Sequence, residues 1–316
     1  MTNLLSGITH IFSPKPAERK PTLGLVLSGG GSRGFAHIGV LQALEEAEIA
    51  VDYLAGASMG GVIAAAYASG LTPQEVAEIA INNGTMHQLL RLASPGIPHN
   101  GLFRGEQLLE FFRKHLHDAD FADLHIPLNL VAVDLNSGQE VHLNEGPVAE
   151  AVRATLSVPG LLTPVERENQ RLVDGGLLNN MPVDVARAMG ADMVLAVDVN
   201  AVTVGAPFWQ SLAENRVLGS AIGGTISVLI DSLTLVIRRQ SACKLREYPP
   251  DFLIQPAIDS SVNLLSGYDR ASDIIAIGYE AAQPFLPSLR EALSVGPYRH
   301  DHRSFPTTDH SLGAHL

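Results

Sequence analysis

The segment Leu23-Gly24-Leu25-Val26-Leu27-Ser28-Gly29-Gly30-Gly31-Ser32-Arg33-Gly34 runs from apolar residues into a cluster of glycines. From Phe35 to Ile49, apolar residues recur at helical spacing, so this order predicts a strand, a glycine loop and a helix. A second unit follows directly, with a short apolar run at Tyr53–Ala57 and an alanine-rich segment at Met59–Ala68. Two successive βα units indicate a parallel sheet with helices on its faces.

The rest of the chain continues this alternation and adds a hairpin. Leu128–Asp134 and Glu140–Leu143 flank the turn residues Asn136-Ser137-Gly138, which predicts two antiparallel strands. The same patterns predict helices at 73–81, 106–116, 150–156, 183–189, 208–245 and 270–285, and strands at 171–173, 193–197 and 252–255. We therefore expect an α/β fold, a three-layer α/β/α domain whose central sheet is mainly parallel and partly mixed.

Composition indicates one domain and excludes one class of partner. The chain has 316 residues, 46% of them hydrophobic, which is enough for one large core. We expect a domain at 21–295, an extension at 1–20 and a disordered, histidine-rich tail at 296–316 whose spacing fixes no metal site. The formal net charge of -12 would repel a phosphodiester backbone, so no nucleic acid is expected as a partner.

The cysteine content and the first residues bear on the compartment. The one cysteine, Cys243, can form no internal disulfide and fits a reducing environment. The apolar stretch Leu4–Phe12 has neither a basic start nor a small-residue cleavage site, so we predict no signal peptide. We expect a cytoplasmic protein, either free or peripheral at a membrane.

Gly56-Ala57-Ser58-Met59-Gly60 is a G-x-S-x-G motif between a predicted strand and a predicted helix. A serine in this context lies on a tight turn, and its hydroxyl projects into a cleft beside a helix N-terminus that favours developing negative charge. A purely structural turn is the alternative. The strand-turn-helix order favours Ser58 as a nucleophile.

The glycine loop has two interpretations. Consecutive N–H groups of Gly29, Gly30 and Gly31 can point into one concavity and bind the oxyanion of an ester's tetrahedral intermediate. The loop also satisfies G-x-G-x-x-G with Gly34, and Asp52 follows 18 residues later, as in dinucleotide-binding folds. We favour the oxyanion hole, because an esterase requires both a nucleophile and such a site.

A nucleophilic serine needs a proton acceptor, and the histidines offer no clear candidate. None of the twelve histidines lies in a strand-end motif, and His37, inside the first predicted helix, fits a packed residue better than a base. Asp174-Gly175-Gly176 follows the predicted strand at 171–173, which puts a carboxylate at a strand end in a loop that allows close approach. A plain turn is the alternative for this tripeptide.

These three motifs, in this order, resemble those of the patatin-like phospholipase family: G-G-G-x-[KR]-G at 29–34, G-x-S-x-G at 56–60 and D-G-[GA] at 174–176. The segments 134–138 and 153–160 also resemble family segments, with Thr155 where serine is common. The resemblance covers roughly residues 21–200. It is nearest to the bacterial single-domain members and to the catalytic domain of neuropathy target esterase, which prefer lysophospholipids or simple esters.

The resemblance implies a serine hydrolase that cleaves acyl esters of phospholipids or lysophospholipids through a dyad of Ser58 and Asp174, without histidine and without metal or organic cofactor. It also implies that the first glycine loop is the oxyanion hole. Residues that support the motifs are Arg33, Gly34, Gly56, Gly60, Gly175 and Gly176. Because a free aspartate with a pKa of about 3.9 accepts a serine proton poorly, we expect burial to raise the pKa of Asp174.

The roles of Arg33 and of the segment 208–240, and the function itself, each have more than one interpretation. Arg33 fits either a site for a substrate phosphate or a turn residue paired with a carboxylate. In the segment 208–240, Val217–Ile237 is largely apolar but contains Asp231, which disfavours a membrane span. A buried helix, a cover over the acyl groove, a dimer face and peripheral membrane contact all fit. An acyltransferase on the same scaffold and a non-enzymatic lipid-binding module are the competing functions, and the homo-oligomeric state is open.

Overall fold

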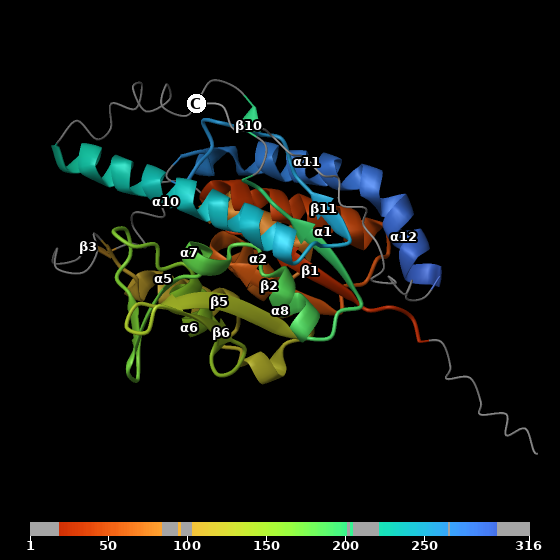
Figure 1. Ribbon diagram of the computed structural model, residues 1–316, viewed down its shortest axis with the longest axis horizontal. Coiled ribbons are helices and arrows are strands. Elements are labelled where there is room, and N and C mark those ends of the chain that lie inside the picture. The colour runs from red at the N-terminus through yellow and green to blue at the C-terminus, as the bar shows by residue number, and fades with distance from the viewer. Residues whose placement is uncertain are drawn as a thin grey trace, which may run out of the picture.

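The computed structural model describes residues 19–83, 94–95, 103–200, 203–204, 221–264 and 266–295 (Figure 1). The predicted tail, and all of the predicted extension except Arg19 and Lys20, lie outside the described residues. An eight-stranded sheet has the order β11-β9-β1-β2-β5-β8-β7, with β6 paired to β5. Its strands are β1 (Leu23–Leu27), β2 (Tyr53–Ala57), β5 (Leu128–Asp134), β6 (Gln139–Leu143), β7 (Val165–Arg167), β8 (Gln170–Asp174), β9 (Met193–Val197) and β11 (Phe252–Ile254).

The sheet is mainly parallel and partly mixed, which confirms the predicted fold class. The strands β11, β9, β1, β2 and β5 are parallel to one another. The strands β6, β8 and β7 add antiparallel pairs, and β5–β6 is the predicted hairpin. Two short pairs lie outside this sheet: β3 (Ser94–Pro95) with β4 (Phe103–Arg104), and β10 (Thr203–Val204) with β12 (Ile258–Asp259).

Side chains along the central strands alternate between two cores. Leu25 and Leu27 of β1 belong to the larger core, and Val26 between them belongs to the smaller one. In β5, Leu130 and Val131 divide in the same way. Successive side chains of a strand point to opposite faces, and here both faces are buried, as expected for parallel strands covered on two sides.

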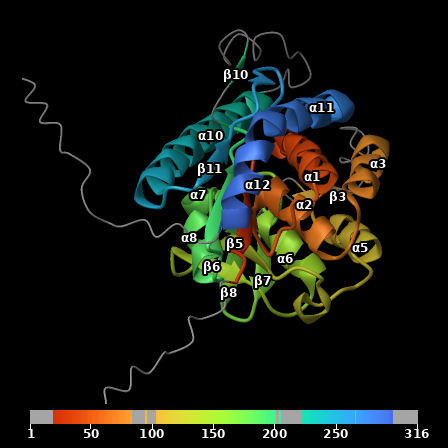
Figure 2. The same cartoon turned by 90° about the vertical axis from the view of Figure 1, so that its right-hand side faces the viewer.

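Helices cover both faces and complete the three layers (Figure 2). The larger core is covered by α1 (Ala36–Glu46), α2 (Ser58–Ala68), α3 (Pro73–Asn83), α5 (Glu106–His115), α6 (Val148–Thr155), α11 (Ala271–Ala282) and α12 (Leu286–Val295). The smaller core is covered by α7 (Gly176–Asn179), α8 (Val183–Ala188) and α10 (Ala221–Glu247). Figure 2 shows these two sets of helices on opposite sides of the sheet.

The two longest predicted helices have different bounds in the structure. The segment predicted at 270–285 becomes α11, a 3₁₀ turn at Gln283–Phe285 and then α12, because Pro284 cannot continue regular helical hydrogen bonding. The long helix predicted at 208–245 is α10, which ends at Glu247, and residues 205–220 lie outside the described residues. Within the described ranges, no helix combines the length and the apolar composition needed to cross a membrane.

One edge of β5 carries two strands end to end. Along this edge β2 pairs in parallel as far as Ala57, which is opposite Val131. The antiparallel strand β8 ends at Asp174, which is opposite Ala132. The carboxyl ends of β2 and β8 therefore meet at adjacent residues of β5, and this brings Ser58 beside Asp174 across 116 residues of sequence.

Candidate active site

Ser58 lies on the tight turn between β2 and α2. Its φ is 50°, in the left-handed region that residues with a Cβ rarely adopt. Close packing defines the turn, because a Cβ on Gly60 would lie 2.2 Å from the carbonyl oxygen of Leu27. The Ser58 hydroxyl is thus held at the first turn of α2, where the backbone N–H groups have no helical acceptor.

Asp174 is the hydrogen-bond partner of Ser58. Ser58 Oγ donates to Asp174 Oδ2 at 2.6 Å, and Asp174 Oδ1 accepts the N–H of Gly176 at 2.8 Å. Both side chains of the pair are buried. Burial raises the pKa of Asp174 from 3.8 to about 6, while the hydrogen bonds from Ser58 and Gly176 act in the opposite direction. The carboxyl group is therefore a better proton acceptor than an exposed aspartate and is still ionised at neutral pH.

Thr155, at the end of α6, fixes the backbone of the nucleophile. Its Oγ1 accepts the N–H of Ser58 at 2.9 Å and donates to the carbonyl oxygen of Val131 at 2.6 Å. The side chain is fully buried. The sequence marked Thr155 only as a departure from the family segment at 153–160, whereas the structure links it directly to the Ser58 turn.

Two asparagines hold the glycine loop. Asn180 Oδ1 accepts the N–H of Gly29 at 3.0 Å, and Asn200 Nδ2 donates to the Gly29 carbonyl oxygen at 2.6 Å. The N–H of Gly29 is therefore already used, in contrast to the expectation that it binds an oxyanion. No acceptor among the described residues contacts the N–H of Gly30 or of Gly31, so these two groups are free to bind a ligand.

The loop asparagines could not be recognised from the sequence as site residues. Asn180 follows the D-G-G motif, and Asn200 comes shortly after β9, but asparagines are common in such loops. Only the parallel pairing of β9 with β1 brings Asn200 beside the glycine loop. The position of each asparagine after a motif or strand end was the available signal.

Arg33 is buried, lines the same cavity as Ser58 and Asp174, and has no carboxylate partner among the described residues. One of its terminal nitrogens lies 3.4 Å from Asn200 Oδ1, and its Nε has no hydrogen-bond partner in the described part of the chain. No ion pair between described residues includes Arg33. Burial lowers its pKa to about 10; Arg238 acts in the same direction and Asp198 in the opposite one. The guanidinium group thus keeps its charge at neutral pH and has donor capacity to spare.

The other motif glycines are sites of close packing. An added Cβ would lie less than 3.0 Å from a neighbouring atom at Gly34, Gly56, Gly175 and Gly176. At Gly175 the neighbour is the carbonyl oxygen of Val131, so D-G-G allows β8 to end against β5. These residues position the site and present no side chain to a ligand.

His37 and Asp52 have structural roles. His37 is fully buried with Nε2 2.8 Å from the Ser28 carbonyl oxygen, and burial lowers its pKa to about 4, so it is a neutral packed residue. Asp52 Oδ2 accepts the N–H of Leu23 at the beginning of β1. The glycine loop follows the other end of β1, so Asp52 is not placed to bind a nucleotide ribose there.

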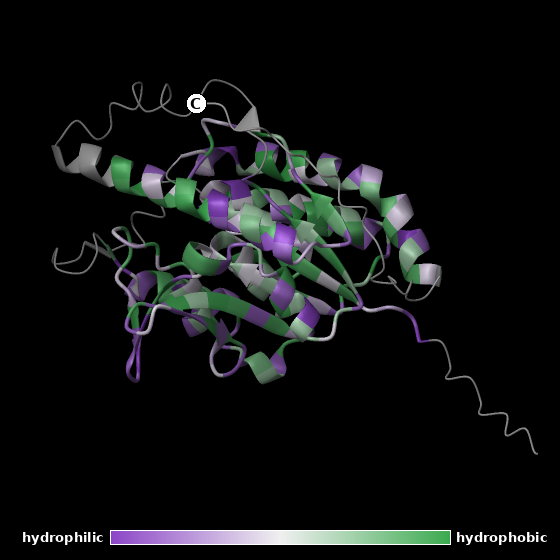
Figure 3. Cartoon of the chain, in the orientation of Figure 1, coloured by the Kyte–Doolittle hydropathy of each residue, from purple (hydrophilic) through white to green (hydrophobic). Residues whose placement is uncertain are grey.

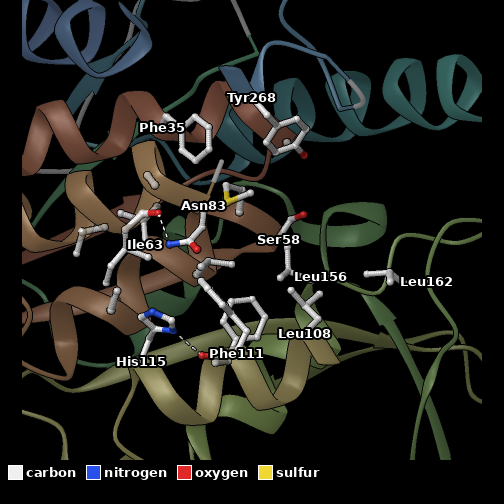
Figure 4. Close-up of a pocket in the computed structure, with 18 of the residues that line it drawn as sticks. Phe35, Ser58, Ile63, Asn83, Leu108, Phe111, His115, Leu156, Leu162 and Tyr268 are labelled. Carbon is white, nitrogen blue, oxygen red and sulfur yellow. Dashed lines mark hydrogen bonds between the residues drawn. The ribbon is translucent and has the colours of Figure 1, made fainter. Parts of the chain in front are cut away.

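An apolar cavity of about 250 Å³ opens beside Ser58 (Figure 4). Its lining comes mainly from α2, α3 and α5 and from residues 156–162. In Figure 4, Ser58 lies on one side of the cavity and His115 on the other. Two polar side chains of its wall other than Ser58 bind backbone: Asn83 Nδ2 donates to the Ile79 carbonyl oxygen, and His115 Nδ1 lies 2.8 Å from the Phe111 carbonyl oxygen. The cavity therefore suits a hydrocarbon chain.

A second cavity of about 480 Å³ lies between the glycine loop and α10 and also contacts Ser58. Asp174 contributes to its wall, as do Arg33, Arg238 and Asp231. Apolar side chains of α10 complete the wall. Ser58 thus lies between an apolar cavity and a second cavity whose wall includes two arginines and two aspartates.

The family model for patatin-like phospholipases matches residues 25–187, a range that includes the glycine loop, Ser58 and Asp174. The chain belongs to the patatin-like phospholipase family. The resemblance inferred from the three motifs is therefore confirmed.

Several relatives of this patatin-like chain are longer proteins. An uncharacterised NTE family protein of Mycobacterium tuberculosis is 37% identical over 180 residues, covering 57% of this chain and 49% of the relative. Patatin-like phospholipase domain-containing protein 6 of Homo sapiens is 38% identical over 186 residues, covering 56% and 13%. Lysophospholipase nte1 of Aspergillus fumigatus is 29% identical over 288 residues, covering 86% and 19%. The match thus takes in about half of the mycobacterial relative and smaller parts of the other two.

Solved structures with a related fold are more distant from this patatin-like chain in sequence. VipD from Legionella pneumophila is 16% identical, with a TM-score of 0.48 over 85% of this chain and 67% of that one. Human GIVD cytosolic phospholipase A2 is 12% identical, with a TM-score of 0.45 over 87% and 60%.

Proposed function

We propose that this patatin-like protein hydrolyses acyl ester bonds of phospholipids or lysophospholipids, with Ser58 as nucleophile and Asp174 as general base. One observation carries the proposal: Ser58 Oγ and Asp174 Oδ2 lie 2.6 Å apart where the apolar cavity and the cation-bearing cavity meet. An ester with its acyl chain in the first cavity and its head group in the second has its carbonyl carbon beside Ser58. The lysophospholipase name of one relative supports the same substrate class.

In the proposed reaction, Asp174 takes the hydroxyl proton of Ser58 as Oγ attacks the carbonyl carbon. The tetrahedral intermediate then breaks the bond to the leaving oxygen, which receives the proton from Asp174. Water, deprotonated by the same carboxylate, attacks the acyl-enzyme; the bond between Ser58 Oγ and the acyl carbon breaks, Oγ takes the proton back from Asp174, and the fatty acid is released. The raised pKa of Asp174, about 6, brings it closer to the pH at which it must exchange protons.

We assign to the glycine loop the stabilisation of the negative charge that develops on the carbonyl oxygen. The free N–H groups of Gly30 and Gly31 are the proposed donors, and the N-terminus of α2 adds a favourable dipole. The N–H of Gly29 instead anchors the loop to Asn180. Preorganised donors of this kind act in the transition state because their orientation is fixed before the charge develops.

The head group is assigned to the second cavity. Arg33 lines this cavity and its buried Nε has no hydrogen-bond partner among the described residues, and Arg238 contributes a second cation from α10. A phosphate binds guanidinium groups through charge-assisted hydrogen bonds. The apolar cavity, at about 250 Å³, fits one acyl chain better than two, so lysophospholipids are the favoured substrates.

The test compares hydrolysis of a short-chain p-nitrophenyl ester and of a lysophospholipid by wild type, Ser58→Ala and Asp174→Asn. We expect both variants to lose activity by at least about a thousandfold, since each removes one of the two side chains that the proposed reaction requires. Circular dichroism checks that both variants are folded. An Asp174→Asn protein that keeps wild-type turnover would contradict the proposed base, and an inert wild type would favour a lipid-binding module.

A further inference from the structure

Exposed apolar side chains gather on one helix of the described chain. Of seven exposed large apolar residues among the described residues, four lie on α10: Val228, Leu229, Leu235 and Val236. Val228 is 65% exposed and Leu235 is 73% exposed, so the rest of the described chain leaves most of these two side chains uncovered. At 100° per residue the four fall on one side of the helix. Figure 3 shows apolar segments recurring along α10 at the edge of the molecule.

The same side of α10 becomes cationic toward its end. Arg239 and Arg246 are exposed, and neither takes part in an ion pair among the described residues. From Val228 to the end of α10 the carboxylates are Asp231, which lines the second cavity, and the exposed Glu247 at the last residue. The outer face therefore combines apolar side chains with unpaired arginines on a chain whose formal net charge is -12.

The inner side of α10 is firmly attached to the domain. Lys244 Nζ lies 2.6 Å from Asp184 Oδ2 on α8, and the buried Ser241 lies 3.4 Å from Asn180 Nδ2. Leu235, at the rim, is exposed and also lines the second cavity. The exposed face thus continues into the cavity that contacts Ser58, without an intervening element of the described chain.

We propose that the outer face of α10 docks on a lipid surface, with the four apolar side chains inserted among the acyl chains and the arginines at the phosphates. Apolar burial beside cations that match anionic head groups is the chemistry of interfacial helices. Docking there aligns the mouth of the second cavity with the lipid. We choose a lipid surface as the occupant, rather than a second copy of this chain. This choice rests on the proposed function and on the unpaired arginines.

The test measures vesicle binding without turnover. Full-length Ser58→Ala protein is floated with phosphatidylcholine vesicles, with and without phosphatidylglycerol. Adding Val228→Asp and Val236→Asp should weaken partitioning on the order of tenfold or more, since two apolar anchors become charged. Arg239→Gln should weaken binding to the phosphatidylglycerol vesicles alone. The matched control is Ile81→Asp with Leu135→Asp, two similarly exposed apolar residues elsewhere, which should bind as well as the parent protein.

A second measurement does not depend on introducing charges. Because the chain has one cysteine, replacing Cys243 by serine allows a polarity-sensitive fluorophore to be attached at Val236→Cys, with Ile81→Cys as control. We expect a blue shift with vesicles for the label on α10 and none for the label on α3. Equal spectra at both sites would overturn the proposal.

Two further readouts separate the outcomes. With Ser58 intact, the Val228→Asp, Val236→Asp protein should hydrolyse a monomeric p-nitrophenyl ester at the wild-type rate, because neither residue lines a cavity. A protein that binds vesicles but hydrolyses no ester would contradict the proposed function and leave the docking face standing. A protein that hydrolyses esters but does not bind vesicles would contradict the docking face and leave the proposed function standing. If light scattering shows a dimer that these substitutions dissociate while vesicle binding is unaffected, the face belongs to a second copy and the proposal is wrong.

Discussion

At the scale of single residues, Ser58 has a backbone conformation that it would not adopt alone. Its φ of 50° is in a region that costs a non-glycine residue about 1–2 kcal/mol. The turn is held by Thr155 at the Ser58 N–H and by Asp174 at the hydroxyl. Part of the free energy of folding is therefore spent on orienting the proposed nucleophile.

Glycine should relieve this strain, and the stabilities of two inactive variants test it. We expect Ser58→Gly to exceed Ser58→Ala in free energy of unfolding by about 1 kcal/mol in urea denaturation. The order should reverse at the exposed Ser272 in the first turn of α11, where alanine is the better helix former. An alanine variant at Ser58 that is as stable as the glycine variant would mean that the left-handed turn is not maintained.

Asp174 should link stability to pH through its raised pKa. Because its pKa in the folded protein, about 6, exceeds its ordinary value of 3.8, the folded state binds the proton more tightly and loses stability as pH rises through this window. Asp174→Asn has no such loss. We expect it to be more stable than wild type at pH 8, by up to about 3 kcal/mol, with the difference vanishing below about pH 4.

The same group should set the acid limb of activity. The proposed mechanism needs the ionised carboxylate, so we expect turnover of a p-nitrophenyl ester by wild type to fall below about pH 6. Thermal melts of wild type and Asp174→Asn over one pH series check the predicted stability difference, and wild-type rates over the same series check the predicted loss of activity. A stability difference between wild type and Asp174→Asn that does not change with pH would show that this carboxyl group has an ordinary pKa.

At the scale of elements, the glycine loop depends on two loops far away in sequence. Asn180 follows β8 and Asn200 follows β9, and both bond the backbone of Gly29. Since the free N–H groups belong to Gly30 and Gly31, a shift of Gly29 moves the proposed oxyanion donors as well. The loop is thus oriented by neighbours rather than by its own sequence.

Removing one of these asparagines should slow the reaction more than it weakens substrate binding. We expect Asn180→Ala to lower kcat by about ten- to a hundredfold with little change in KM, because misplaced donors act mainly on the transition state. Asn179→Ala is the matched control: this neighbouring buried residue bonds Glu140 and Asp184 instead. It should cost stability but keep kcat, and an equal kcat loss in both variants would indicate a general disturbance of α7.

The elements differ in how far the sequence predicts them. Tyr53–Ala57 and Met193–Val197 match β2 and β9 in both bounds, because each is an apolar run with polar or glycine residues nearby. Pairing is harder to predict: that β8 is antiparallel and ends against β2 on one edge of β5 depends on contacts distant in sequence. Motifs therefore indicate Ser58 and Asp174, whereas Thr155 emerges only once α6 is packed.

At the scale of the whole molecule, the candidate site residues gather at the carboxyl ends of β1, β2 and β8. The larger core underlies the apolar cavity, and α10 with the smaller core forms the wall that carries Arg238. The α10 helix runs along the surface in Figures 1 and 2, with an inner side facing the cavity and an exposed apolar outer side. A strongly negative protein thus presents a locally cationic, apolar face beside its candidate active site.

The meeting of β2 and β8 on β5 has an evolutionary consequence. Ser58 and Asp174 are both aligned by neighbouring residues of one buried strand, whereas α3, α5 and α10 supply much of the two cavity walls. Changes in those helices can alter the shape of the cavities while the 2.6 Å distance between Ser58 Oγ and Asp174 Oδ2 is preserved. If the proposed reaction takes place there, such a separation lets a lineage acquire new substrates by helix variation alone, with the reaction inherited intact.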